Sequence, residues 1–236
     1  MKHPFIFPKL AFLFLAAALS GCSQKYQDVQ DTMSLALSGP ADIVLPPEQV
    51  IDLPYASMYA KVENSAQAFL VLGFAEPTHS KVSALAGVHR LKWLSANHEM
   101  LVTERGRIVK TINLLGGNLS ASFSSMPDPL ALGLLKADTP KIWERQIDWQ
   151  PGHFSSVTLK SEFKAQGAQT IMVNDSPVET LLFTESVYAV ELNQHFENKF
   201  WLHPSSGRVI ASKQFLAPGL ASIDITVLKP FAGELQ

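Results

Sequence analysis

The chain has 236 residues, of which 47% are hydrophobic and 17% charged, a composition typical of a folded protein long enough to form its own apolar core. Its 19 basic and 21 acidic residues give a net charge of −2, which excludes the strongly basic surface expected of a nucleic-acid-binding protein. The single cysteine excludes intramolecular disulfides and thiolate metal sites.

The first 21 residues are typical of a secretory signal peptide. Lys2 and Lys9 precede a short apolar run at 10–19, and no acidic residue interrupts it. This run is shorter than the about 20 residues that a membrane-spanning helix needs. The next residues, reading LSGC up to Cys22, resemble the lipobox of bacterial lipoproteins, in which the cysteine is acylated and the peptide is cleaved before it.

Cys22 is therefore the predicted lipid attachment site. One acyl chain binds a membrane reversibly, whereas several chains on one residue make the attachment stable. Ser23 follows in place of the aspartate that would resemble an inner-membrane retention signal. We expect a protein anchored by lipid in the outer membrane and facing the periplasm. The 17 basic residues that remain after cleavage, against 21 acidic ones, provide no polybasic membrane patch.

Behind the anchor we expect a lipidated tether at 22–27 and a single mainly β periplasmic domain at 28–236. Apolar residues recur four apart in 27–38, which predicts an amphipathic helix that Gly39 and Pro40 end. A single helical turn is predicted to start near Pro47, where a missing N–H group costs nothing.

After Leu53 the apolar period changes to two, and turn signals recur at short intervals, which predicts an antiparallel meander. It would form a curved sheet, a sandwich or a half-open barrel. The predicted strands are 55–62, 67–76, 88–94, 99–103, 107–113, 141–149, 153–165, 169–173, 179–191, 199–203, 208–215 and 221–228. Residues 116–137 interrupt this pattern, and we interpret them as a long loop with a short helix near 130–135. One alternative is that this loop divides two sub-sheets.

The sequence shows little sign of catalytic chemistry. The histidines are scattered without metal-ligand spacing, and no nucleophile elbow or phosphate-binding loop follows a strand. We predict no metal, no cofactor and no catalytic residue. The tryptophans are Trp93, Trp143, Trp149 and Trp201, all in predicted strands, where a ring either packs in the core or offers an exposed platform for sugars. Trp201 and its neighbour Phe200 must face opposite sides of their strand.

Several blocks of the chain resemble the YjbF/GfcB family of outer-membrane lipoproteins, which includes proteins of group 4 capsule clusters. The blocks lie at 53–60, 91–95, 100–111, 198–201 and 207–209. The resemblance runs from the lipobox almost to the end of the chain. It implies a part in the production or export of exopolysaccharide or capsule, with periplasmic and outer-membrane proteins of the same export cluster as possible partners. It supplies no catalytic residues.

Arg107 and Arg208 each follow a turn glycine and open a predicted strand. This position suits a surface ion pair, which we favour, or the capture of an anionic sugar group. With Trp201 they are the candidate ligand-binding residues, whereas His98 and Arg105 are expected only as turn residues.

The leading hypothesis is a non-enzymatic accessory lipoprotein that holds partners at the outer membrane or guides the polysaccharide outward. One alternative is a carrier lipoprotein that binds lipid or an acyl chain with a curved sheet, which a large apolar cavity would favour. The other is a glycan-modifying enzyme, which would need carboxylates that meet in a cleft, with a raised pKa.

Overall fold

The computed structural model describes residues 41–78 and 87–234, which form one compact unit from Asp42 onward. The predicted signal peptide, Cys22, the tether and the helix predicted at 27–38 lie outside the described residues. The longest described helix has 6 residues, and no helix in this part of the chain can span a membrane.

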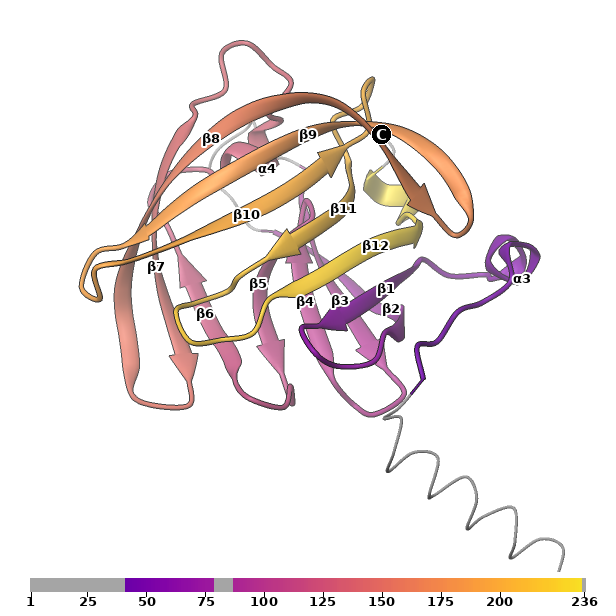
Figure 1. Ribbon diagram of the computed structural model, residues 1–236, viewed down its shortest axis with the longest axis horizontal. Coiled ribbons are helices and arrows are strands. Elements are labelled where there is room, and N and C mark those ends of the chain that lie inside the picture. The colour runs from indigo at the N-terminus through magenta and orange to yellow at the C-terminus, as the bar shows by residue number, and fades with distance from the viewer. Residues whose placement is uncertain (1–40, 79–86, 235–236) are drawn as a thin grey trace, which may run out of the picture. The chain divides into compact units, whose positions relative to one another are not determined.

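Twelve antiparallel strands make up most of this unit, which confirms the predicted mainly β fold (Figure 1). The strands are β1 (Ser57–Val62), β2 (Ala68–Pro77), β3 (His89–Ser95), β4 (Met100–Glu104), β5 (Arg107–Ile112), β6 (Asn118–Phe123), β7 (Ile142–Gln150), β8 (Phe154–Val173), β9 (Ser176–Ala189), β10 (Gln194–Leu202), β11 (Val209–Gln214) and β12 (Ile223–Lys229). The helical elements are α3 (Pro47–Asp52), α4 (Pro129–Leu132) and the 3-10 turn η2 (Ala232–Glu234). Pro47 occupies the first turn of α3, as predicted.

The segment predicted as a long loop contains β6, so that prediction was wrong for its first part. β6 reads NLSASF, and only Leu119 in it is buried, so the strand carries almost no apolar alternation. The short helix in the second part is confirmed as α4. Asp128 caps it by accepting a hydrogen bond from the backbone N–H of Leu130 at 2.9 Å, and Pro129 occupies its first turn.

Two of the predicted strands, 153–165 and 169–173, are one continuous strand. β8 passes through the intervening residues with an irregularity between Ala165 and Gly167, and it pairs with β9 from Leu159 to Val173. The polar and small residues there are exposed, so they broke the apolar pattern without ending the strand.

All twelve strands belong to one sheet in the order β5-β4-β3-β2-β1-β12-β11-β10-β9-β8-β7-β6, in place of the two sub-sheets considered above. Its end strands, β5 and β6, flank residues 113–117. They meet through side chains: Thr111 Oγ1 accepts from the backbone N–H of Leu119 at 3.0 Å and donates to Asn118 Oδ1 at 3.2 Å. The sheet is therefore curved into a nearly closed, barrel-like form.

Antiparallel order places the connections β2–β3, β4–β5, β6–β7, β8–β9 and β10–β11 at one end of the sheet, called here the long-loop end, together with α4 and η2. The opposite end carries the turns β1–β2, β3–β4, β5–β6, β7–β8, β9–β10 and β11–β12. Figure 1 shows α4 and η2 at the upper end of the molecule.

Two apolar clusters fill the interior. The main cluster includes Trp93, Ile147, Trp149, Leu159 and Ile225 and draws on most strands of the sheet. The smaller cluster lies under α4 and consists of Leu130, Leu134, Trp143, Phe163, Phe183, Phe200, Leu202 and Val209.

Candidate functional site

A buried ion-pair cluster lies where the two apolar clusters meet. Arg107 donates from Nη1 to Glu185 Oε2 at 2.9 Å and from Nη2 to Asp128 Oδ1 at 3.2 Å, and its Nε also contacts Asp128. Arg145 donates from Nη1 to Glu185 Oε1 at 2.9 Å. The side chains of Arg107 and Glu185 are 3% and 0% exposed, so these charges depend on one another rather than on water.

Neutral groups complete the cluster. Asn198 donates to Glu185 Oε2 and Ser161 Oγ accepts from Arg145, each at 2.9 Å. The Trp143 ring lies 4.7 Å from the guanidinium carbon of each arginine, which adds a cation–π contact for both. The two arginines and two carboxylates sum to zero charge, as a buried group of ions requires.

Burial alone would raise the pKa of Glu185, but Arg107 and Arg145 reverse that effect and lower the pKa to about 2. For Arg107, burial opposes the charge, yet Asp128 and Glu185 outweigh it and raise its pKa. For Arg145, burial and the nearby charge of Arg107 outweigh Glu185 and lower its pKa. Glu185 is thus held as a carboxylate, the opposite of what a general acid needs.

Arg107 forms an ion pair, but the surface location that we favoured was wrong, because the pair lies in the interior. Arg208, for which a surface ion pair was also favoured, forms none among the described residues. Arg145 shares the parity of the buried Trp143 and Ile147 in β7, and the structure shows it inside. Neither Arg145 nor Glu185 was among the candidate residues. The same signal was present, because Glu185 shares the parity of the buried Phe183 and Val187.

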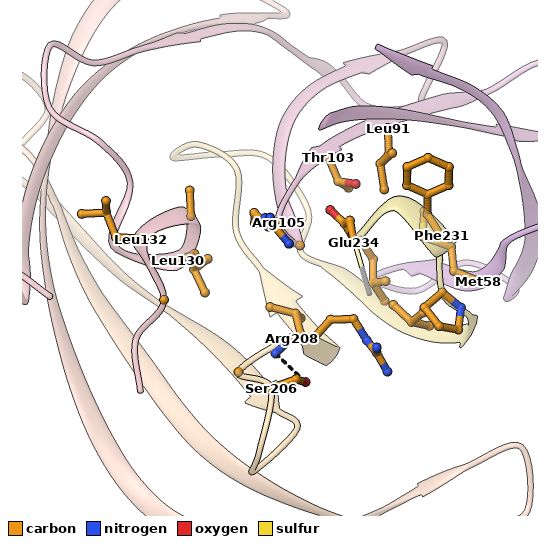
Figure 2. A pocket seen from close by; sticks show the side chains of 18 of the residues that line it. Met58, Leu91, Thr103, Arg105, Leu130, Leu132, Ser206, Arg208, Phe231 and Glu234 are labelled. Atoms are coloured by element: carbon orange, nitrogen blue, oxygen red, sulfur yellow. Dashed lines mark hydrogen bonds between the residues drawn. The ribbon is translucent and has the colours of Figure 1, made fainter. Parts of the chain in front are cut away.

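A pocket of about 300 Å³ opens at the long-loop end of the sheet (Figure 2). Figure 2 shows Arg105 and Arg208 between Leu130 and Leu132 on the left and Glu234 and Phe231 on the right. The described residues that line it come from five strands, from the β4–β5, β6–β7 and β10–β11 connections with α4, and from the segment after β12 with η2. They are Met58, Leu91, Trp93, Thr103, Arg105, Gly106, Leu130, Ala131, Leu132, Gly133, Lys136, Ser206, Gly207, Arg208, Val209, Ile225, Val227, Pro230, Phe231 and Glu234.

Turn geometry brings the two arginines to this pocket. Arg105 and Gly106 form the two-residue β4–β5 turn, both with positive φ, at 48° and 89°. A Cβ atom on Gly106 would lie only 2.6 Å from Val209, so the turn packs closely against the start of β11. Arg208 directly precedes Val209. The β4–β5 and β10–β11 turns therefore place Arg105 and Arg208 close together at the pocket.

The polar groups of this pocket are poorly satisfied within the described residues. The Nε atoms of Arg105 and Arg208 and Oε1 of Glu234 are buried and have no hydrogen-bond partner there. Burial raises the pKa of Glu234, whereas Arg105, Arg208 and His89 act in the opposite direction. Two arginines and Lys136 against one glutamate make the pocket cationic, although the whole chain is slightly acidic.

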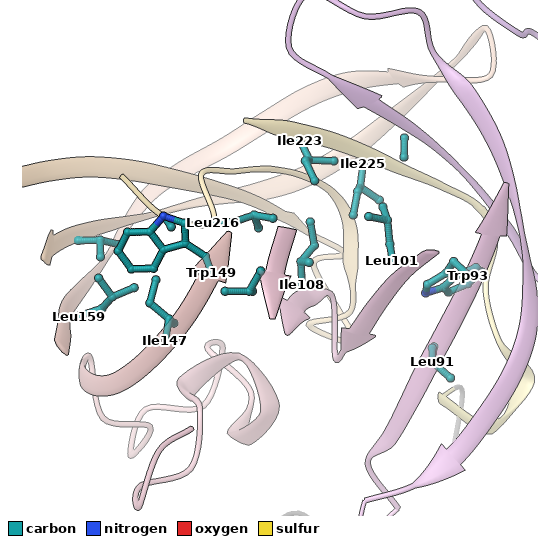
Figure 3. Close-up of a cluster of buried hydrophobic side chains, with 14 of the residues drawn as sticks. Leu91, Trp93, Leu101, Ile108, Ile147, Trp149, Leu159, Leu216, Ile223 and Ile225 are labelled. Atoms are coloured by element: carbon teal, nitrogen blue, oxygen red, sulfur yellow. The ribbon is translucent and has the colours of Figure 1, made fainter. Parts of the chain in front are cut away.

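The inner wall of the pocket belongs to the main apolar cluster. Leu91, Trp93 and Ile225 are buried members of that cluster and line the pocket (Figure 3). The indole N–H of Trp93 donates to Thr103 Oγ1 at 2.8 Å, so this N–H group is already bonded within the protein.

The third candidate residue, Trp201, lies away from both groups. It is half-buried, and its indole N–H donates to Gln169 Oε1 at 2.8 Å. Its neighbour Phe200 is completely buried on the other side of β10, as expected from strand geometry. Among the described residues, no group of three or more His, Cys, Asp or Glu side chains is arranged to hold a metal ion.

Sequence comparison relates this chain to capsule lipoproteins. The sequence profile described as "Group 4 capsule polysaccharide lipoprotein gfcB, YjbF" matches residues 30–228. The uncharacterized lipoprotein GfcB of Escherichia coli K12 is 33% identical over 222 residues, which cover 94% of this chain and 98% of the relative. The uncharacterized lipoprotein YjbF of the same strain is 28% identical over 231 residues, covering 97% and 98%.

Structural comparison gives the same relationship. The crystal structure of the hypothetical lipoprotein YmcC from Escherichia coli K12 matches with a TM-score of 0.67 and 31% sequence identity, covering 85% of this chain and 95% of that one. Sequence and fold therefore agree, and the chain belongs to the YjbF family of group 4 capsule polysaccharide lipoproteins.

Proposed function

We propose that this protein is a non-enzymatic accessory factor in the production or export of exopolysaccharide or capsule, held at the outer membrane through acyl chains on Cys22. The observation that carries the proposal is the family match, which spans residues 30–228 and therefore nearly the whole domain. The relatives named GfcB and YjbF are called lipoproteins, which supports the same use of the lipobox at Cys22.

The interior charges support a non-enzymatic role. Arg107, Arg145, Asp128 and Glu185 satisfy one another, and their arrangement joins β5 to β7, β9 and the cap of α4. These ion pairs lie close to the place where the end strands β5 and β6 meet without backbone pairing. They therefore stabilise the curved sheet. Among the described lining residues of the pocket, Glu234 is the single carboxylate, whereas glycoside hydrolysis ordinarily uses two.

A short tether gives the proposed mechanism. Residues 22–27 can reach roughly 20 Å when extended. The domain would then meet only partners in or near the membrane, at an effective concentration of about millimolar order. Its partners would be periplasmic and outer-membrane proteins of a polysaccharide-export cluster or the polysaccharide itself, for which the half-buried Trp201 is a candidate contact.

The test is a deletion strain assayed for surface polysaccharide under conditions that express the cluster. We expect polysaccharide to be reduced or abolished while growth stays nearly normal, and the unmodified gene to restore it. Unchanged polysaccharide in the deletion strain would refute the role in this pathway.

A Cys22→Ser variant at native abundance tests the anchor separately. We expect it to incorporate no labelled palmitate, to leave the membrane fraction and to restore polysaccharide poorly. Ser23→Ala is the matched control, because it changes the adjacent residue and keeps the cysteine. Full restoration by an unacylated Cys22→Ser protein would retain the pathway and overturn the tethering mechanism.

A further inference from the structure

We propose that the pocket at the long-loop end binds an amphiphilic anion, with the anionic group on Arg105 and Arg208 and the apolar part against Leu91, Trp93 and Ile225. This site is independent of the role proposed above and adds a ligand that the family relationship does not supply. The ligand class is a carboxylate or phosphate attached to a short apolar chain.

Arg105 and Arg208 would bind the anionic group of the ligand. Each has a buried Nε atom without a hydrogen-bond partner in the described residues. A buried donor without an acceptor costs about 1–3 kcal/mol, so an anion that accepts from both would relieve that cost. Planar guanidinium groups are suited to carboxylate and phosphate oxygens. The exposed Lys136 adds positive charge at the opening.

The inner wall of the pocket would bind the apolar part of the ligand. Met58, Leu91, Trp93 and Ile225 are buried there, and the Trp93 indole N–H already donates to Thr103. A sugar ring pushed against this wall would bury hydroxyl groups without partners, which is unfavourable. An alkyl chain has no such groups and gains from burial. The wall therefore favours an amphiphile over an acidic sugar.

The size of the pocket limits the ligand. About 300 Å³ is at the lower end of the range of small-molecule sites, so one short chain fits better than two long ones. Phe231 and Glu234 close part of the opening from the segment that follows β12. The Phe231 ring lies 5.4 Å from the His89 ring in an edge-to-face contact, which holds the segment after β12 against β3.

Calorimetric titration of the full chain carrying Cys22→Ser, prepared without detergent, tests the proposal. The probes are butanoate, hexanoate and octanoate, with octyl phosphate, octylamine and glucuronate for comparison. We expect affinity to rise about fourfold per added CH₂ until the pocket is full. We also expect the octyl anions to bind, and octylamine and glucuronate not to. The ratio of the affinities for octanoate and octyl phosphate then shows whether the natural ligand is a fatty acid or a lipid phosphate.

Variants locate the site. Arg105→Gln and Arg208→Gln should each weaken octanoate binding about 10- to 100-fold, the range expected for loss of a charge-assisted hydrogen bond. Arg90→Gln is the matched control, because Arg90 pairs with Glu104 on the exposed side of β3 and does not line the pocket. It should bind as tightly as the parent.

Three results would overturn the proposal: no binding of any probe, binding of glucuronate without octanoate, or affinity that does not depend on chain length. The chain-length series uses no pocket variant, so it decides the question even if an arginine variant fails to fold.

Discussion

The interior of this protein uses arginine in two different ways within a short distance along the chain. Arg107 is fully buried and bonded to Asp128 and Glu185. Arg105, two residues earlier in the same hairpin, lines a pocket and leaves its Nε atom without a partner in the described residues. Arg208 follows a turn glycine just as Arg107 does, yet it belongs to the second group. Sequence position therefore does not separate an arginine that stabilises the fold from one available to a ligand; the carboxylates around it do.

The same substitution at Arg107 and at Arg208 tests this difference most directly. Arg107→Leu should lower the free energy of unfolding by about 3–5 kcal/mol, because Asp128 and Glu185 would lose a buried partner. Arg208→Leu should change it by less than about 1 kcal/mol, because no ion pair is lost. Urea unfolding measures both. Equal losses would show that the two arginines do not differ in role.

Low pH is a second test of the buried ion-pair cluster. Since the pKa of Glu185 falls from 4.5 to about 2 on folding, its contribution to stability is complete above pH 4.5 and is lost as the pH falls to 2. We expect unfolding experiments to show a loss of a few kcal/mol over this window. Glu185→Gln should be less stable at neutral pH and should show a flatter pH dependence. A variant that loses stability over pH 4.5 to 2 as steeply as the parent would refute this account.

The smallest expected effect concerns Glu234 in the pocket. Its carboxylate competes with an anionic ligand for Arg105 and Arg208, so Glu234→Gln should bind octyl sulfate severalfold more tightly at pH 7.5. Burial raises the pKa of Glu234. The parent should therefore gain affinity as the pH falls and Glu234 becomes neutral, whereas the variant should gain less. Glu76→Gln, which affects an exposed pair with Lys92, is the control for calorimetric titration. Weaker binding by Glu234→Gln would contradict the competition.

Much of the sheet could be predicted from apolar runs of strand length between turn signals, and most clearly where a strand alternates, as β7 does. β7 shows buried side chains at every second position, and Arg145 is one of them. β6 was missed because small polar residues surround its one buried leucine, Leu119, so its pairing with β7 is determined by the fold rather than by local apolar pattern.

The pocket was harder to predict than the sheet. Arg208 was recognised as a candidate from its place after a turn glycine, but Arg105 was assigned only a turn role. Their convergence depends on the packing of Gly106 against Val209, two residues far apart in the chain. Glu234 belongs to a segment after the last strand, and no periodicity marks it. Long-range contacts of this kind leave no local signal in one sequence.

The pairing of β1 with β12 has a consequence for the order of folding. Every other pair of neighbours in the sheet is also adjacent in the chain, so those pairs close over much shorter stretches of chain than β1 and β12 do and form faster. β1 must wait for the last strand, since Lys61 pairs with Asp224. Until then the free edges of β1 and β12 expose unsatisfied backbone groups that can pair with another chain. The time of greatest risk of aggregation is therefore the interval before these two strands meet, and damage to β12 should expose the chain to aggregation more than comparable damage to a central hairpin.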